Sequence, residues 1–591
     1  MGRLVNKIVF GSTVLMCLLN TQVYSQVNQG DFNIFITNIP KEKIAININT
    51  DIILAGETLY YKLYSLSNDN NKPSHISKIA YVELIGENQN LLFSYKLKLV
   101  DGLANGDFFI PANTKTGNYK MIAYTKWMNN NENNPFCQTD IFIINPFLLN
   151  ENTLDEQLII KNKSANVLEI KKGENSAEQH LDNNTINLKT NSNTYKTRSK
   201  VVLELVNNLE QTNFGNYSLS VRKIDSLNII KEDTGINDYF ENSQINSNSI
   251  PEVRGEIISG KVISKSGDKL VSDKIVSLSI SGSNFIYKNV KTDKSGNFYF
   301  NIYENYTDTD AIVQLLDENK GDYKIVIDDL SFKYYNKFEF QRINLNPNIQ
   351  DWLLKQSIYN QIENAFHRSK EDSIISNKPS AVFYGQPTVE YVLDDYKRFP
   401  TVKETFVEVI QEAAIRKIGN TYRFKVYNYE ELRNNVFSDY DPLVLVDGIL
   451  IQNSDDVLAY DSNKIEKVNI VRGIYFYGPS IFNGIIDIKT KKGDFILQRD
   501  REYLNYFHLS SPKENKLYYQ PKYNDGHESL KRIPDYRNQL LWEPNVYLNS
   551  NLKAFEFYTS DIEGMFEILL TGFTLNGKSV TLKKYIEVKN E

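Results

Sequence analysis

The sequence predicts a multidomain, mainly β chain that contains one small α/β domain. At 591 residues the chain is too long for one hydrophobic core, and domain size alone favours roughly three to six domains. Most apolar residues fall in short runs rich in Ile, Val, Tyr and Phe between polar turns, which is typical of β-strands. Helical periodicity is found mainly between Asn348 and Lys417.

The first 25 residues have the pattern of a secretory signal peptide. Arg3 and Lys7 precede an apolar run, Ile8–Leu19, and the segment ends in Val23-Tyr24-Ser25. The alternative of a lipid anchor at Cys17 is disfavoured because no small residue precedes this cysteine. The run is too short to cross a bilayer, and no later stretch is longer. We therefore expect an exported chain, in the periplasm or associated with the outer membrane, without a membrane-spanning segment after cleavage.

The net charge argues against a nucleic-acid-binding protein, and the cysteine content argues against a fold held by internal disulfides. The net charge of −6 argues against a nucleic-acid partner, because phosphate binding needs clustered positive charge. After cleavage only Cys137 remains, so no internal disulfide can form and the domains must be held by their cores.

Residues 27–147 are predicted to form the first β-sandwich. Strand-like runs such as "TLYYKLYSL", "IAYVELI" and "YKMIAYTKWM" alternate with turns. The segments "AGETLYYKLY" and "NGDFFIPANTKTGNYKMIAYT" resemble the N-terminal macroglobulin-type β-sandwich of exported bacterial alpha-macroglobulin relatives. This resemblance implies an immunoglobulin-like, macroglobulin-type fold for the first domain.

Residues 148–250 are expected to combine a polar linker with a second β-sandwich. The first part is rich in Asn, Lys, Glu and Ser. The strands "SKVVLELV" and "GNYSLSVRKI" follow it and suggest a second macroglobulin-type domain.

Residues 251–345 are expected to form a third sandwich. Gly260-x-Val262 and Thr292-Asp293-x-x-Gly296-x-Phe298 resemble the carboxypeptidase regulatory-like domain, which implies a small prealbumin-like sandwich without zinc ligands. Asp293, Ser295 and Asn297 alternate like the start of a calcium loop, but further acidic ligands are missing, which favours a hydrogen-bonded turn.

Residues 346–394 are predicted to form a helical connector. Trp352, Tyr359, Ile362 and Phe366 fall on one face of a helix of about twenty residues. A second helical stretch, Val402–Lys417, begins just after Pro400-Thr401.

Residues 395–495 contain the most specific pattern in the chain. In "PLVLVDGILIQNSDD" an apolar strand precedes Asp447-Gly448, a dipeptide suited to a tight hairpin turn. A short helix from Ser454 to Tyr460, a strand "KIEKVNIVRG", a Gly-rich connection "YFYGPSIFNG" and a closing strand "IIDIKTKKG" follow. The order and spacing of these elements resemble the plug domain of TonB-dependent outer-membrane receptors.

In that receptor family a barrel follows the plug in the same chain. Here only the 98 residues after Gly493 follow, fewer than the more than 200 that about 22 strands would need. We therefore expect a plug-like domain without its barrel. Residues 496–591 are expected to form a C-terminal macroglobulin-like β segment, because "AFEFYTSDIEGMFEILLTGFTLNGKSV" resembles that type of sheet.

No catalytic, cofactor or metal site is predicted. The five histidines have no metal-binding spacing, and "PFCQTD" around Cys137 lacks the glycine of a thioester motif. Asp447 is interpreted as a turn residue. We therefore expect no enzyme activity.

The candidate partner contact is the aromatic run Tyr475, Phe476 and Tyr477. Aromatic anchors are enriched at interfaces, although one or two of these rings could instead pack on the sheet.

The favoured hypothesis is a non-enzymatic, modular envelope protein that binds or scaffolds outer-membrane machinery, namely an outer-membrane protein or a transport or assembly complex. Two alternatives remain open. The chain could supply its plug domain in trans within a TonB-dependent transport system, or it could be a macroglobulin-like protein that binds proteases. No small-molecule ligand is identified.

Overall fold

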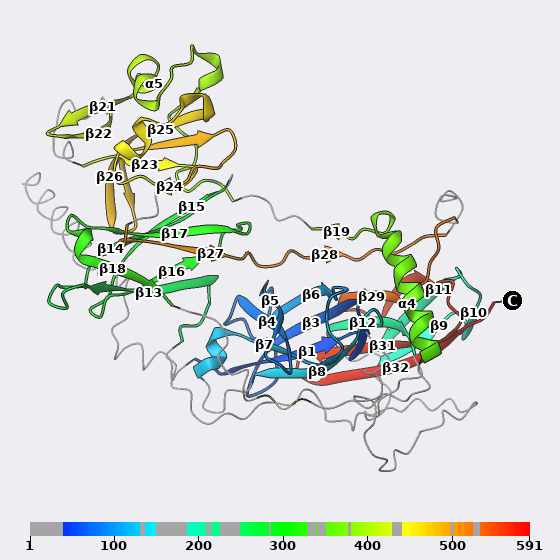
Figure 1. Cartoon of the computed structure of the whole chain (residues 1–591). Coiled ribbons are helices and arrows are strands. Elements are labelled where there is room, and N and C mark those ends of the chain that lie inside the picture. The colour runs from blue at the N-terminus through cyan, green and yellow to red at the C-terminus, as the bar shows by residue number, and fades with distance from the viewer. Residues whose placement is uncertain are drawn as a thin grey trace, which may run out of the picture. The chain divides into compact units, whose positions relative to one another are not determined.

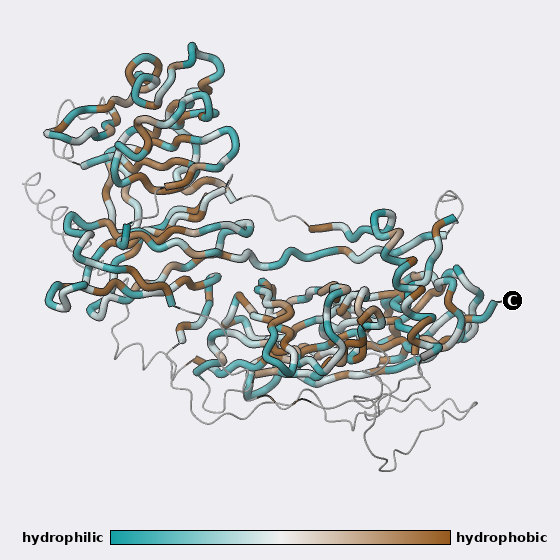
Figure 2. The backbone as a smooth tube through the Cα atoms, viewed as in Figure 1, coloured by the Kyte–Doolittle hydropathy of each residue, from teal (hydrophilic) through white to brown (hydrophobic). Residues whose placement is uncertain are grey.

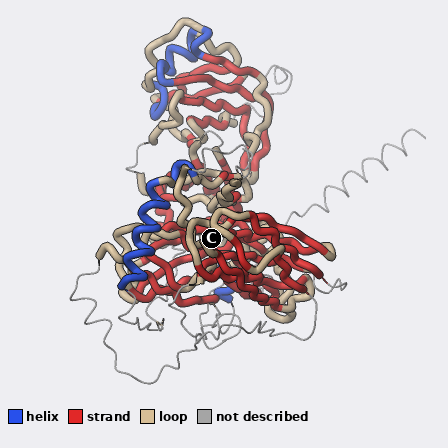
Figure 3. Tube along the Cα trace, turned by 90° about the vertical axis from the view of Figure 1, so that its right-hand side faces the viewer, coloured by secondary structure: helices blue, strands red, loops and turns tan. Residues whose placement is uncertain are grey.

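The chain has a mainly β architecture in the computed structural model, in which strands greatly outnumber helices (Figures 1 and 3). The structure describes residues 39–130, 136–148, 186–207, 214–224, 249–282, 285–328, 338, 340, 350–375, 380–427, 440–497, 501–523 and 532–590. The elements below all belong to one compact unit, Lys41–Glu591. The signal peptide lies outside the described residues and stays a prediction. Among the helices that are described, none is long and apolar enough to cross a membrane.

The first sandwich is built from two sheets, with strand orders β1-β3-β6 and β2-β8-β7-β4-β5. Its strands are β1 (Glu42–Ile48), β2 (Ile52–Leu54), β3 (Thr58–Ser67), β4 (Ile79–Gly86), β5 (Leu91–Lys98), β6 (Leu103–Phe109), β7 (Gly117–Tyr124) and β8 (Cys137–Ile144). A short 3-10 helix, η1 (Lys126–Asn130), precedes β8. Figure 2 shows apolar segments along these strands, and their side chains form one buried core.

The second sandwich is assembled from two distant parts of the chain. Its sheets have the orders β10-β32-β31-β12-β29 and β30-β11-β9. The early strands are β9 (Ile186–Thr190), β10 (Thr194–Tyr195), β11 (Lys200–Asn207) and β12 (Gly215–Lys223), and the late strands are β29 (Gln539–Leu548), β30 (Leu552–Tyr558), β31 (Gly564–Thr574) and β32 (Ser579–Val588). Because β12 lies between β29 and β31, neither part can form the sheet alone. The sequence analysis treated residues 148–250 and 496–591 as separate segments. In the structure, strands from both segments form one sandwich, and the third sandwich and the α/β unit are inserted between them in sequence.

An ion pair fastens the two parts of the second sandwich. Arg198 donates from Nε and Nη2 to the two carboxylate oxygens of Asp561, at 2.6 and 2.7 Å, and Nη2 also donates to the carbonyl of Ile533. Thr559 donates to the carbonyl of Lys196 at 2.7 Å. The segment Thr559–Asp561 thus binds the early half of its own sandwich.

The third sandwich also receives a strand from later in the chain. Its sheets have the orders β16-β13-β18 and β15-β14-β17-β27. The strands are β13 (Glu256–Ser264), β14 (Ile275–Ile280), β15 (Ile286–Lys291), β16 (Asn297–Ile302), β17 (Thr309–Leu316), β18 (Tyr323–Ile327) and β27 (Leu504–Leu509), with a 3-10 turn η3 (Lys320–Asp322). β27 follows the α/β unit in sequence and pairs antiparallel with β17. The α/β unit is therefore inserted between strands of one sheet.

The α/β unit, residues 389–490, contains a five-stranded sheet of order β20-β25-β26-β23-β24 and a separate hairpin, β21-β22. Its strands are β20 (Val389–Val392), β21 (Ala413–Ile418), β22 (Thr421–Val426), β23 (Leu443–Val446), β24 (Ile449–Leu450), β25 (Ile465–Tyr477) and β26 (Ser480–Thr490). Its helical elements are η7 (Leu393–Asp395), α5 (Val402–Glu408), α6 (Asp455–Leu458) and η10 (Ser462–Lys464). β23 runs parallel to β26, so the two apolar strands identified in the sequence are neighbours.

The helix expected over Val402–Lys417 is shorter than its periodicity suggested. Its start is confirmed, because Thr401 and Glu404 form a reciprocal capping box at the N-terminus of α5. The helix ends at Glu408, and Ala413–Ile418 instead pairs with Thr421–Val426 as a hairpin around Gly419. Strand pairing overrides the local helical pattern here.

The connector helix α4 (Gln350–Ala365) is confirmed, but its buried face is largely polar. Gln356, Ser357 and Asn360 are buried, whereas Phe366 is 36 % exposed. The reason is the polar surface it meets, where Asn538 donates to Gln356 at 2.7 Å. The remaining short elements are η6 (His367–Ser369) and the pair β19 (Ser373–Ile374) and β28 (Lys516–Leu517).

The ion pair across the second sandwich generates a stability prediction. Arg198→Ala should lower the stability of this sandwich by about 1–3 kcal/mol, because it leaves the carboxylate of Asp561 without its charged donor. Trp542 in β29 can report the urea transition by fluorescence in a background in which Trp127 and Trp352 are replaced by Phe. As a control, Lys200→Ala removes a more exposed ion pair with Glu556 and should leave the midpoint unchanged. Equal shifts for both variants would contradict the assigned role.

Candidate functional site

The predicted contact residues Tyr475, Phe476 and Tyr477 lie in a strand, not in the loop-like connection that the sequence suggested. β25 continues to Tyr477, a turn at Gly478 follows, and β26 begins at Ser480. Gly478 has a φ of 53°, which allows the tight turn. Alternate residues of a strand point to opposite faces.

This alternation divides the three aromatic residues. Tyr475 donates a hydrogen bond to the carbonyl of Phe383 at 3.1 Å, and Tyr477 donates to the carbonyl of Tyr287 at 2.6 Å. Phe476 is 68 % exposed. The structure thus places two rings in packing contacts within the chain, and one ring in solvent.

The two inward tyrosines belong to an aromatic join between the α/β unit and the third sandwich. The ring of Tyr477 lies 5.7 Å from that of Tyr287 and 4.6 Å from that of Phe383, centroid to centroid. The join has a buried core of residues from both units, namely Phe285, Tyr287, Leu443, Leu445, Leu450, Phe482 and Ile485. Burial raises the pKa of Tyr477, so its phenol stays protonated as a donor.

Hydrogen bonds and close packing fix the same join. Gln314 in β17 donates to the carbonyl of Leu450 at 2.9 Å. Gly448 is the second residue of the tight turn, and a Cβ added there would lie 2.1 Å from the Cβ of Phe285. Glycine is therefore required at this position by close approach as well as by its φ of 84°.

Asp447 is a turn residue, as the sequence predicted, and its side chain also accepts hydrogen bonds from a later segment. Its φ is 50°, and β23 and β24 pair directly across it. Its buried carboxylate accepts hydrogen bonds from the backbone N–H and hydroxyl of Thr490, at 2.8 and 2.6 Å, and from the N–H of Phe495 at 3.2 Å. The turn therefore holds the end of β26 and the segment that leaves the unit.

A buried polar cluster that sequence reasoning missed lies on the same sheet. Asp487 in β26 is fully buried and accepts a hydrogen bond from the Tyr384 hydroxyl at 2.6 Å. Nζ of Lys489 lies 3.7 Å from the Asp487 carboxylate and 4.1 Å from the centroid of the Phe285 ring. Desolvation raises the pKa of Asp487 and lowers that of Lys489. The alternation in "IIDIKT" could have indicated this cluster, since it places both charges on one face.

The described residues contain no group of three or more potential metal ligands, so the predicted absence of a metal site stays a prediction. Asp293 resembles the start of a calcium loop, yet its carboxylate accepts from the N–H groups of Ser295 and Asn297, both at 2.8 Å. This is a side-chain-stabilised turn. Cys137 is a buried free thiol, and burial raises its pKa, which makes it unreactive.

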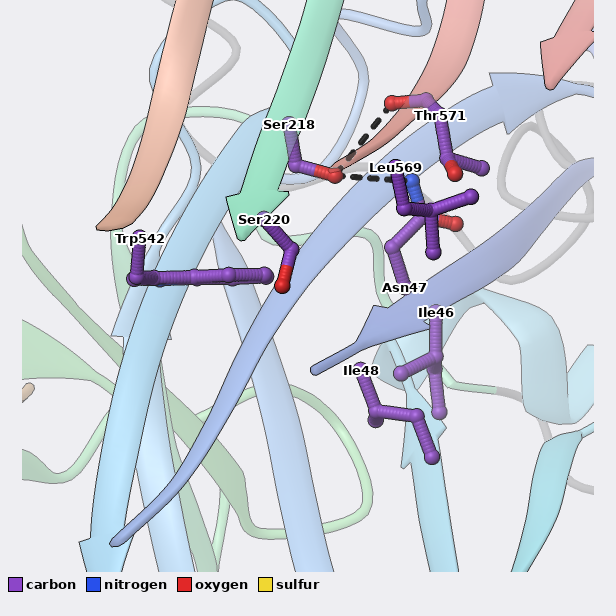
Figure 4. Close-up of a pocket in the computed structure, with 8 residues that line it drawn as sticks. All are labelled: Ile46, Asn47, Ile48, Ser218, Ser220, Trp542, Leu569 and Thr571. Atoms are coloured by element: carbon purple, nitrogen blue, oxygen red, sulfur yellow. Dashed lines mark hydrogen bonds between the residues drawn. The ribbon is translucent and has the colours of Figure 1, made fainter. Parts of the chain in front are cut away.

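A small cavity of about 160 Å³ lies between β1 of the first sandwich and strands of the second (Figure 4). Figure 4 shows the residues around it: Ile46, Asn47, Ile48, Ser218, Ser220, Trp542, Leu569 and Thr571. Asn47 donates to Ser218, which donates to the carbonyl of Thr571. The volume corresponds to about five water molecules and is below that of typical ligand pockets. Trp542 contributes a buried indole N–H that has no hydrogen-bond partner among the residues that the structure describes.

The Asp447 turn provides a matched mutational comparison. Asp447→Ala should destabilise the α/β unit by about 2–4 kcal/mol, because three donors lose their acceptor and alanine is strained at positive φ. Asp447→Asn should cost less, since asparagine tolerates this φ and keeps one acceptor oxygen. Asp273→Ala isolates the backbone cost, because Asp273 has a φ of 57° and makes no side-chain hydrogen bond within the described residues. Urea midpoints by pulse proteolysis would check the order; similar losses for Asp447→Ala and Asp273→Ala would refute it.

The raised pKa of Asp487 predicts a pH dependence. Because its folded pKa exceeds the unfolded value near 3.8, the folded state binds the proton more tightly. The stability of the α/β unit should therefore fall as pH rises from about 3.8 through the folded pKa. Pulse proteolysis across this window should show the fall in the native chain, and Asp487→Asn should remove that part of it. An unchanged slope in the variant would contradict this assignment.

Comparisons with known proteins give weak likenesses. No protein-family model matches the chain, and no curated protein matches it. Solved structures include Salmonella alpha-2-macroglobulin reacted with methylamine (TM-score 0.24, 10% identity, covering 93% of this chain and 40% of that chain). For the native conformation of Escherichia coli alpha-2-macroglobulin the TM-score is 0.24 and the identity is 10%, and the match covers 94% of this chain and 40% of that chain. For dimeric latent PorU from Porphyromonas gingivalis the TM-score is 0.15 and the sequence identity is 10%, and the match covers 49% of this chain and 33% of that chain. The chain spans about two fifths of the length of these macroglobulins, and TM-scores this low establish no common fold over the whole chain.

Proposed function

We propose that this chain is an exported, non-enzymatic binding protein of a bacterial envelope. In this proposal it resides in the periplasm or at the outer membrane, and its α/β unit docks to an outer-membrane protein or to a transport or assembly complex. The signal-peptide pattern supports export, and the resemblance of residues 395–495 to a receptor plug supports the choice of partner. The sandwiches would act as the scaffold that carries the docking unit.

The observation that supports the proposal most directly is the exposed ring of Phe476 between two tyrosines that are fixed by hydrogen bonds. Its neighbours Tyr475 and Tyr477 are fixed by hydrogen bonds to backbone carbonyls, while Phe476 itself is 68 % exposed. An exposed aromatic ring that sits on an ordered strand loses little conformational entropy on binding and can bury a large apolar area. These are the properties of an anchor residue at a protein interface.

The aromatic join favours docking over action as a plug in trans. If the unit were to enter a separate receptor alone, it would have to leave the third sandwich and expose Leu443, Leu445 and Ile485. Removing such a core from its partner is costly, since each large apolar side chain contributes roughly 1.5–3 kcal/mol. Protease binding, the other alternative, rests on the macroglobulin resemblance of the sequence alone.

Site-specific photo-crosslinking in intact cells tests the proposal. A photoreactive phenylalanine analogue at position 476 should cross-link to an outer-membrane protein, identified by mass spectrometry. The same analogue at Tyr547, which is 45 % exposed in β29 of the second sandwich, serves as the control. Phe476→Ser should reduce co-purification of the same protein from envelope fractions. Identical cross-links at both positions, or none from position 476, would reject docking through this residue.

A further inference from the structure

The hairpin of β21 and β22 carries an unusual arrangement of positive charge. In its register Arg416 lies directly opposite Arg423, and Lys425 follows on the same face. The opposite face packs into the core of the α/β unit through Ala413, Phe424 and Val426. Because residues paired across an antiparallel ladder share a face, both arginine side chains lie on the solvent face, where both residues are exposed.

The chain only partly compensates this repulsion. The carboxylate of Asp441 accepts from Arg423 at 3.2 Å and from Lys425 at 3.0 Å. Arg416 donates to the hydroxyl of Tyr427 at 3.0 Å, and within the described residues no carboxylate forms an ion pair with it. Among the residues that the structure describes, three cations on this face therefore share one paired carboxylate. Like charges directly opposite each other destabilise a hairpin, so this face is costly to keep unless it has another use.

The surroundings indicate what the face would bind. The chain as a whole has a net charge of −6, so this patch is a local exception. The planar guanidinium of arginine forms paired hydrogen bonds with carboxylates. Ile418 and Tyr427, 46 % and 36 % exposed, lie on the same face and offer apolar contact between the charges. An extended segment presents alternate side chains about 7 Å apart on one side, which suits a row of charges along a strand.

We propose that this face of the hairpin binds an acidic segment of a partner protein, with two or more carboxylates at alternate positions. A membrane surface fits less well, because three cations with one partly exposed isoleucine give only weak attraction and no apolar face to insert. The inference goes beyond docking through Phe476. It holds whether or not the partner belongs to the outer membrane, so the two proposals can fail separately.

Binding of a defined peptide to the full-length protein without its signal peptide tests the inference. The probe is a fluorescent peptide of four Glu-Ser repeats, followed by anisotropy, with four Gln-Ser repeats as the uncharged probe. The Glu-Ser peptide should bind and should weaken between 50 and 200 mM NaCl, as expected for surface charges. The charge reversal R416E/R423E should weaken it at least about tenfold. The control K189E/K583E makes the same change of net charge on the second sandwich and should leave the affinity unchanged.

A folding readout distinguishes lost binding from a damaged protein. The neutral double variant R416Q/R423Q should bind the peptide weakly yet have a urea midpoint at least as high as that of the native chain, because the repulsion is gone. Equal weakening by R416E/R423E and K189E/K583E would overturn the proposal, as would absence of peptide binding. Binding to phosphatidylglycerol vesicles without binding to the peptide would also overturn it, in favour of a membrane surface.

Discussion

The constraint on which the structure depends is the completion of the second sandwich by strands that come last in the chain. β12 cannot be covered on either edge until β29 and β31 pair with it, and Arg198 lacks its partner until Asp561 is in place. The third sandwich and the α/β unit lie between these two parts of the sequence. Their points of attachment are therefore set by a sheet to which they contribute no strand.

The third sandwich contains an insertion of its own, namely the α/β unit. The third sandwich receives β27 after the α/β unit is complete, and the aromatic join then holds the two units together. This arrangement determines which surfaces remain available. It partly buries Tyr475 and Tyr477, and it leaves Phe476 and the arginine face of β21 and β22 outward. Both proposed binding surfaces are thus ones that the internal packing does not use.

Local signals in the sequence predicted what depends on local geometry. The turn at Asp447-Gly448 and the start of α5 at Thr401 were correct, because positive φ and helix capping are set by neighbouring residues. β21 was missed since its helical period gave way to strand pairing. The pairing of early and late strands in the second sandwich was also missed, because no local pattern near Ser218 predicts contact with Thr571, 353 positions later. The burial of Asp487 likewise depends on packing between units.

The division of the second sandwich has a consequence for biogenesis. During synthesis, domains generally fold in order from the N-terminus, but β9–β12 must wait for β29–β32, which are made much later. Until then Tyr217, Leu219 and Val221 would be uncovered next to unsatisfied strand edges, the feature that invites aggregation. In the export that we propose, the native sheet would close only after β29 and β31 have also crossed the membrane, so β9–β12 would cross and wait unpaired.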